Sequence, residues 1–101
     1  MSTVDELRSL ALGLPDTTEG THFKRPTIRV KGKNVIGIEG GTHITFALPP
    51  EAAEAAALRS PGSIEVMERN GKPIGVRADI ARCDAGLLAE LVHICWSHVK
   101  G

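Results

Sequence analysis

Apolar residues near the start of the chain recur at the spacing of an α-helix. The series is Val4, Leu7, Leu10, Ala11 and Leu14. Steps of three and four residues place such side chains on one helix face, and the Thr-x-x-Glu pattern at residues 3–6 is typical of an N-terminal capping box. Because glycine 13 and proline 15 are helix-ending residues, we predict that the helix stops there and that a loop covers residues 16–26.

The chain then alternates between apolar and polar residues, as a half-buried β-strand does. In the predicted strand 27–31, Ile28 and Val30 face the core, while Arg29 and Lys31 lie on the outer face. Further strands are predicted over residues 35–38 and 42–48, after turns at 32–33 and 40–41. Three neighbouring strands with short turns indicate an antiparallel meander.

The second half of the chain predicts two more helices and two more strands. Pro49-Pro50 is expected to open a helix that the Ser60-Pro61-Gly62 segment ends. Strands at 64–67 and 74–78 flank an Asn70-Gly71 turn. In the later strand, the residues predicted to face inward are Ile74, Val76 and Ala78. Asp84 is predicted to cap a last helix, whose apolar stripe is Leu88, Leu91, Val92, Cys95 and Val99.

These elements predict an α+β fold in a single domain, residues 1–101, with the order α-β-β-β-α-β-β-α. Its natural closure is an antiparallel sheet of about five strands covered on one face by helices. A domain of this length buries roughly 60–70 % of the surface that its unfolded chain exposes. It therefore needs neither a disulfide nor a metal to close a core.

Composition narrows the range of partners. The net charge is zero, with 12 basic and 12 acidic residues, which disfavours strong non-specific binding to nucleic acid unless one face gathers the basic side chains. Two phenylalanines, one tryptophan and no tyrosine disfavour a base-stacking platform. Two cysteines suit a reducing compartment. Charged residues at positions 5, 6 and 8 and the lack of an apolar run of about 18 residues lead us to expect a cytoplasmic protein without signal peptide or membrane segment.

Common catalytic motifs are missing from the sequence. It contains no glycine-rich phosphate loop, no serine-centred nucleophile elbow and no HExxH. Cys95 and His98 lie one helical turn apart as candidate metal ligands, but zinc takes three or four, so we predict no metal and no cofactor. Catalysis would require His22 or His43 to meet an acid in a pocket of the fold. We therefore predict no catalytic residues.

The distribution of basic residues is the most informative feature. Residues 20–38 contain no acid. Two hairpin turns carry basic side chains, as the phosphate-contacting hairpins of winged DNA-binding domains do. The candidate nucleic-acid-binding residues on these turns and their strands are Arg29, Lys31, Lys33, Arg69, Lys72 and Arg77. Solvent-exposed turns are also commonly rich in lysine, and lysines protect edge strands, so an ordinary solvated surface is the alternative interpretation.

Three segments resemble the MmcQ/YjbR family. Residues 11–23 (Ala-Leu-Gly-Leu-Pro-Asp-Thr-Thr-Glu-Gly-Thr-His-Phe) are similar to the family's opening signature, in which Leu-Pro precedes Glu-Gly and an aromatic residue. Residues 29–33 (Arg-Val-Lys-Gly-Lys) resemble its first hairpin, and residues 73–77 (Pro-Ile-Gly-Val-Arg) resemble a later strand. The closing helix, which ends near Trp96, is similar to the family's last helix. The resemblance covers essentially the whole chain.

This resemblance implies a frataxin/CyaY-like fold and a double-wing DNA-binding role, with Lys31, Lys33 and Lys72 at the wing tips and Arg77 on the returning strand. The chain departs from the family where aromatic residues usually stand. It has Asn34 and Val35 after the first turn, and Lys72, Pro73 and Ile74 in the second wing. Without those aromatics, we expect contact with the phosphates of duplex DNA that tolerates any sequence.

A second hypothesis, of another class, is a protein-interaction or small-ligand-binding domain without catalytic activity. Such a domain would use an apolar pocket between sheet and helices, or an exposed sheet edge. In that case the basic residues would be scattered over the surface instead of gathered at one place.

Overall fold

The computed structural model of the protein describes residues 4–22, 24–39 and 41–100. Within these residues, three helices and six strands follow in the order α-β-β-β-β-α-β-β-α. They are α1 (Val4–Leu12), β1 (Thr17–His22), β2 (Arg25–Val30), β3 (Lys33–Glu39), β4 (His43–Ala47), α2 (Pro50–Arg59), β5 (Ile64–Arg69), β6 (Lys72–Asp79) and α3 (Ala85–Lys100).

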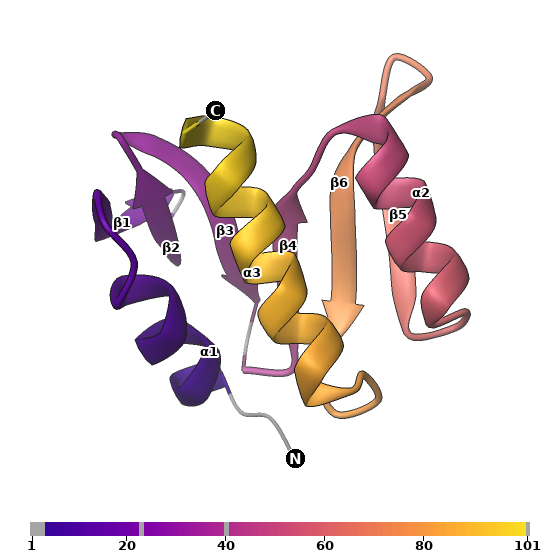
Figure 1. The fold of residues 1–101 in the computed structure, drawn as a ribbon, viewed down its shortest axis with the longest axis horizontal. Coiled ribbons are helices and arrows are strands. Elements are labelled where there is room, and N and C mark those ends of the chain that lie inside the picture. Colours follow the sequence, from indigo (N-terminus) through magenta and orange to yellow (C-terminus); the bar gives the residue numbers. More distant parts are fainter. Residues whose placement is uncertain (1–3, 23, 40, 101) are drawn as a thin grey trace.

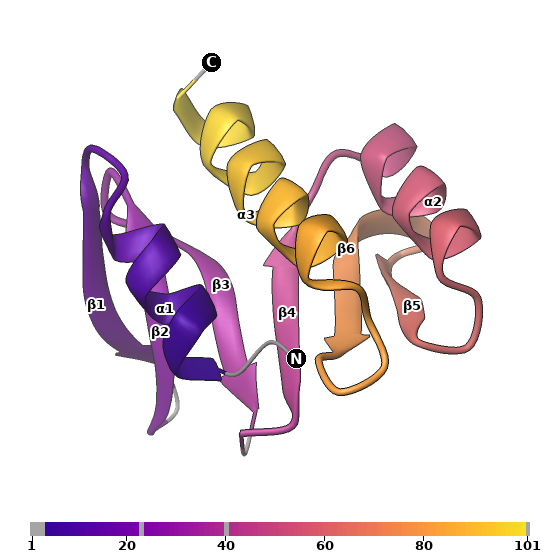
Figure 2. The same ribbon diagram turned by 60° about the horizontal axis from the view of Figure 1, so that its bottom comes forward.

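All six strands form one antiparallel sheet with the order β1-β2-β3-β4-β6-β5. The helices lie on one face of this sheet, with α3 crossing β3 and β4 and with α2 beside β5 and β6 (Figures 1 and 2). The opposite face, which we call the open face, carries polar and small side chains together with the apolar residues Met67 and Ile74. The α+β fold class and the one-sided cover of helices are thus confirmed.

The core lies between the sheet and the helices. Phe46 of β4, Val76 of β6 and Leu88 of α3 are all completely buried, and α3 contributes the largest apolar stripe. The predicted stripe of this helix is confirmed, because Leu88, Leu91, Val92 and Cys95 are buried and Val99 packs partly against them. In α1, Leu7 and Ala11 are buried, whereas Leu10 remains 36 % exposed at the edge of the apolar face.

The predicted loop over residues 16–26 is wrong, because this segment forms β1 and the start of β2. The strand Thr17–His22 has no alternation of apolar residues, and nothing in its composition marks one buried face. Its backbone pairs with β2 along its whole length. An ion pair from Arg8 Nη2 of α1 to Glu19 Oε2 at 2.8 Å adds a contact to the helical layer. Residues 17–22 thus form a strand because their backbone hydrogen-bonds to β2, and not because their side chains are buried.

Two bulges change which side chains face the core. The register of β5 and β6 shifts between Met67 and Glu68, so Ile74 has no cross-strand partner. Its side chain is 40 % exposed, and the prediction that it faces inward is wrong. A similar shift between β2 and β3 leaves Val35 without a partner. Bulges add one residue to a strand and reverse the alternation beyond it, which a regular pattern cannot anticipate.

The starts of α2 and α3 lie at the residues that the sequence predicted. Asp84 caps α3, since its Oδ2 accepts the backbone N–H of Leu87 at 3.3 Å, and Pro50 occupies the first turn of α2 as expected. The predicted capping box at residues 3–6 begins outside the described residues. Within the described part of the chain, we find no helix with the length and hydropathy needed to cross a membrane.

Candidate nucleic-acid interface

The two basic hairpin turns lie at the same end of the sheet. We call residues 31–33 the first tip and residues 69–72 the second tip. Each tip leads directly into a strand, β3 or β6, and both of these strands run antiparallel to β4 between them. β3 and β6 therefore run in the same direction and begin at the same end. Figure 1 shows both tips at its upper edge, on either side of the C-terminal end of α3.

Backbone geometry explains why both turns are tight. Lys31 and Gly32 have φ values of 52° and 83°, and Asn70 and Gly71 have φ values of 53° and 78°. Two successive residues with positive φ define the turn that joins twisted antiparallel strands best. In the second tip Arg69 and Lys72 are direct cross-strand partners, so their side chains leave the strands side by side.

The tip cations are free of acidic partners. Within the described residues, the side chains that are exposed and form no ion pair at the two tips are Lys31, Lys33, Arg69 and Lys72. Most arginines elsewhere are paired with carboxylates. These are Arg8, Arg25, Arg59, Arg77 and Arg82. A chain of zero net charge thus carries four exposed cations without ion pairs at one end of its sheet, where the acid Glu68 of β5 precedes the second tip.

Arg29 lies on the open face next to the first tip, not on it. Its Nε donates to Asn34 Oδ1 at 2.9 Å, and its Nη2 donates to the carbonyl oxygen of Thr21 at 3.2 Å. The guanidinium lies against the backbone of Gly20, where an added Cβ would approach Arg29 Nε to 2.4 Å. These contacts hold the charge of Arg29 flat against the sheet.

Arg77 is not gathered with the tip cations. Its Nε donates to Glu39 Oε2 at 2.9 Å, and its Nη1 lies 4.0 Å from Glu65 Oε2. The hydrogen bond to Glu39 raises the pKa of the Arg77 guanidinium, so this residue stays charged but is matched by two carboxylates. Of the six candidate residues, the structure brings four together at the tips, with Arg29 beside them.

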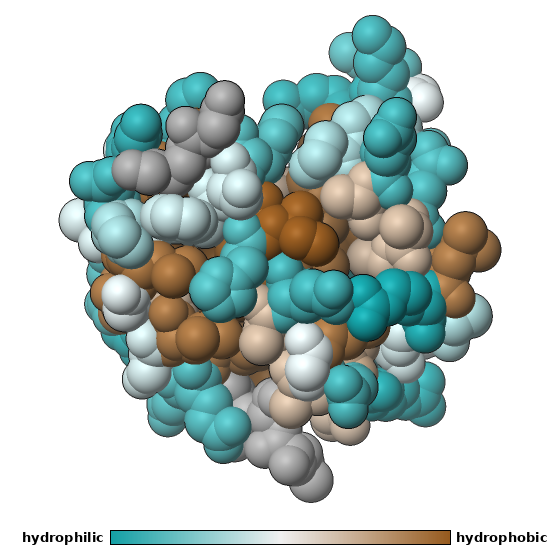
Figure 3. All heavy atoms as spheres, viewed as in Figure 1, coloured by the Kyte–Doolittle hydropathy of each residue, from teal (hydrophilic) through white to brown (hydrophobic). Residues whose placement is uncertain are grey.

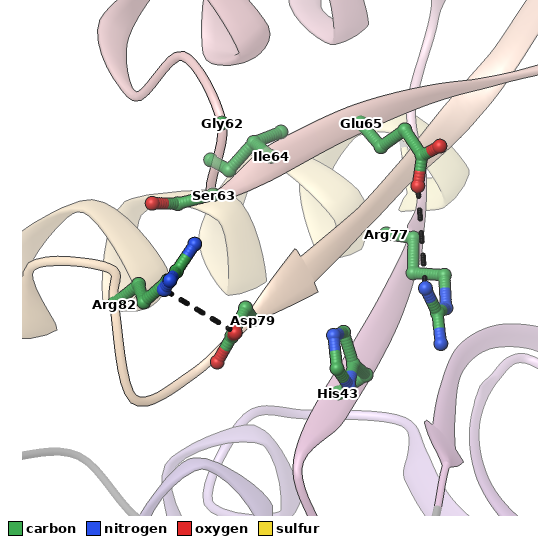
Figure 4. A pocket seen from close by; sticks show the side chains of 8 residues that line it. All are labelled: His43, Gly62, Ser63, Ile64, Glu65, Arg77, Asp79 and Arg82. Carbon is green, nitrogen blue, oxygen red and sulfur yellow. Dashed lines mark ion pairs between the residues drawn. The ribbon is translucent and has the colours of Figure 1, made fainter.

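A charged pocket of about 510 Å³ lies at the opposite end of the open face (Figure 4). His43 of β4 stands across from Asp79 of β6, which partly meets the condition set for an enzyme. Both oxygens of Asp79 are engaged, however. Its Oδ1 accepts the Ala81 N–H at 3.1 Å, and its Oδ2 lies 4.0 Å from Arg82 Nε.

The hydrogen bond that the structure gives to the His43 ring joins Nδ1 to Thr42 Oγ1 at 2.9 Å. The arrangement is therefore a network of ion pairs, with neither acid of this pocket held against the imidazole. Sequence reasoning missed the central member of this network, Glu39, which also pairs with Arg25 at 3.5 Å. Its only sequence signal is that it ends the acid-free segment 20–38.

Cys95 and His98 do not form a metal site with other residues. The Cys95 side chain is completely buried, and its Sγ donates to the carbonyl oxygen of Val35 at 3.3 Å. Burial raises the pKa of this thiol to about 12, which opposes the thiolate that a metal requires. In the described parts of the chain, no three metal-ligating side chains gather.

Lys31 is held in a backbone conformation that favours glycine or asparagine. At φ 52°, a lysine is less stable than an asparagine by roughly 1 kcal/mol. We expect Lys31→Asn to raise the free energy of unfolding by about 0.5–1 kcal/mol while removing one tip cation. Urea denaturation measures this gain, and a loss of stability would show that the Lys31 side chain itself holds the turn together.

The fold is similar to that of a solved bacterial protein. The crystal structure of Deinococcus radiodurans protein DR2400, a DUF419 domain, superposes with a TM-score of 0.82 and 25 % sequence identity. The match covers 99 % of this chain and 80 % of that one. No protein-family model matches the sequence, and no curated protein does. DUF419 is the MmcQ/YjbR family, so the neighbour belongs to the family that the sequence motifs resemble.

Proposed function

We propose that this domain belongs to the MmcQ/YjbR family and binds DNA through its two tips. The observation that carries the proposal is the placement of Lys31, Lys33, Arg69 and Lys72 at one end of the sheet, exposed and without ion pairs. Exposed cations are the groups that neutralise DNA phosphates and release their counterions. The second tip also projects from the body of the protein as a hydrophilic knob (Figure 3).

The strained backbone at the first tip supports the same proposal. Asn70-Gly71 in the second tip is the favoured sequence for such a turn, whereas the first tip has lysine in the equivalent position. Asp16 and Lys24 also have positive φ, so the support comes from the charge that Lys31 places at a tip and not from strain alone. Lysine at position 31 adds a phosphate-binding charge that asparagine would lack.

The test is fluorescence anisotropy with a labelled 20-base-pair duplex at several salt concentrations. If the four tip cations each neutralise one phosphate, log K falls with log[salt] at a slope of about −3.6. Between 50 and 200 mM salt the affinity then falls roughly 150-fold. Absence of binding at 50 mM salt, or binding that salt does not weaken, would contradict the proposal.

The second candidate function, binding of a protein or small ligand, rests on the helical face. A groove of about 460 Å³ runs between the start of α2 and the C-terminal half of α3, beside Pro49 and Ile94. Figure 3 shows apolar residues exposed between these two helices. None of the tip cations lines this groove, so binding of a partner there would depend little on salt.

A further inference from the structure

The open face has a hollow of about 190 Å³ over β4, between the strands β3 and β6 that lead away from the two tips. Its walls come from residues next to the tips, and its floor comes from the strand between them. Asn34 and Val35 follow the first tip, Met67 and Ile74 flank the second tip, and Thr45 and Ala47 belong to β4. The lining also includes residues of β1, β2 and β3 and none of the tip cations; these further residues are His22, Thr27, Ile36 and Gly37. The hollow therefore lies on the open face beside the strands that lead away from the two tips.

The floor of the hollow is flat because its strands carry small residues there. Gly37 lies across from Thr45, and Gly75 lies across from Ala47. A Cβ added at Gly37 would approach Thr45 Oγ1 to 2.6 Å, so a larger residue would begin to fill the space. Met67 and Ile74 stand above this floor, and Ile74 is one of the few large apolar residues with substantial exposure, 40 %.

One polar group at the rim has a fixed orientation. The amide oxygen of Asn34 accepts hydrogen bonds from Arg29 Nε at 2.9 Å and from Thr27 Oγ1 at 3.0 Å. Because Arg29 Nε is only a donor, the oxygen of the amide must face it. The amide NH₂ is therefore turned away from this network and offers its hydrogens at the rim, where an acceptor of a ligand can meet them.

We propose that this hollow receives one unstacked base of the DNA strand whose phosphates contact the tips. The inference rests on the proposed function and adds a preference for DNA with an unpaired base. Sites that enclose whole drug-sized ligands measure roughly 300–1,000 Å³, so about 190 Å³ suits one ring system. The apolar walls contact the faces of the base, and the Asn34 NH₂ donates to an acceptor on its edge. In a paired duplex those faces are stacked and cannot enter.

The experiment compares a paired 20-base-pair duplex with the same duplex carrying one unpaired thymine, by anisotropy at fixed salt. Burial of the base faces against the aliphatic walls is expected to favour the second DNA by about ten-fold. Ala47→Leu places a larger side chain in the hollow and is expected to abolish this preference while the salt slope on paired DNA stays unchanged. Thr45→Leu fills the hollow from a neighbouring position should the first variant fail to fold. Thr18→Leu adds a leucine on the exposed edge strand, outside the hollow, and is expected to keep the preference.

The outcomes separate this inference from the proposed function. Salt-dependent binding without any preference for the unpaired thymine overturns the inference alone. A preference that survives in both leucine variants of the hollow also overturns it, because the base must then bind elsewhere. No binding to either DNA overturns the proposed function and the inference together. Free thymidine that binds a variant with reversed tip charges as well as it binds the wild type would indicate a small-ligand site, and the base proposal would fail.

Discussion

The variant Lys31→Glu/Lys72→Glu is expected to bind duplex DNA at least about 100-fold more weakly than the wild type at 50 mM salt. One exposed cation is reversed at each tip, and in the wild type neither lysine forms an ion pair. At this salt concentration each counterion-releasing contact contributes roughly ten-fold to affinity. The slope of log K against log[salt] should fall from about −3.6 to about −1.8. Anisotropy titrations at three salt concentrations measure both quantities.

A matched control carries the same change in charge at the other end of the sheet. Lys24 lies in the turn between β1 and β2, and Arg82 follows β6, so both are distant from the tips along the strands. Lys24→Glu/Arg82→Glu alters net charge equally but should weaken binding only a few-fold, through long-range repulsion. Equal losses in the two double variants would mean that net charge alone governs binding, and the assignment to the tips would be abandoned.

Gly75→Ala is expected to cost the domain about 3 kcal/mol or more of unfolding free energy. A Cβ built at Gly75 would lie 2.1 Å from the carbonyl oxygen of Phe46 and 3.1 Å from Cα of Ala47. These are backbone atoms of β4 in the middle of the sheet, and they move only if the pairing of β4 and β6 is distorted. Overpacking of this kind is among the most costly single changes. Thermal denaturation should show a decrease in Tm of about 12 °C or more.

Gly13→Ala serves as the control for this second variant. An added Cβ there would meet the Leu10 and Ser9 carbonyl oxygens at 3.5 Å, an ordinary contact, and its φ is not in the left-handed region. The change should be neutral or stabilise the protein by up to about 1 kcal/mol. A Gly75→Ala protein as stable as the wild type would show that β4 and β6 separate there without cost.

The two ends of the open face differ in how their charges are balanced. At the end near His43, Arg77 and Arg82 are matched by Glu39, Glu65 and Asp79. At the other end the tip lysines have no such partners. Arg77 pairs with residues of other strands, and Arg82 pairs with Asp79 three residues earlier in the chain. Exposed ion pairs of this kind contribute little to stability. Their main effect on binding is to remove positive charge from that end of the face and leave the tips as its cationic part.

The sequence by itself determined those features of the fold that depend on residues close together in the chain. The cap at Asp84, the helix start at Pro50, the Asn70-Gly71 turn and the stripe of α3 depend on neighbours within a few residues. Interactions between residues only a few positions apart can be predicted from the spacing of residues along the sequence. The same reasoning identified both basic turns, because a turn and its charges are contiguous in the chain.

Three features of the fold could not be predicted from the spacing of residues along the sequence, because the tertiary structure decided them. β1 exists because β2 offers it hydrogen bonds, and the bulges at Val35 and Ile74 depend on cross-strand register. The insertion of β6 between β4 and β5 brings the two tips to one end of the sheet. It also places Arg77 beside Glu39, 38 residues away. Each of these depends on which strands become neighbours, and that choice is set by packing of the whole core, not by any local segment of the sequence.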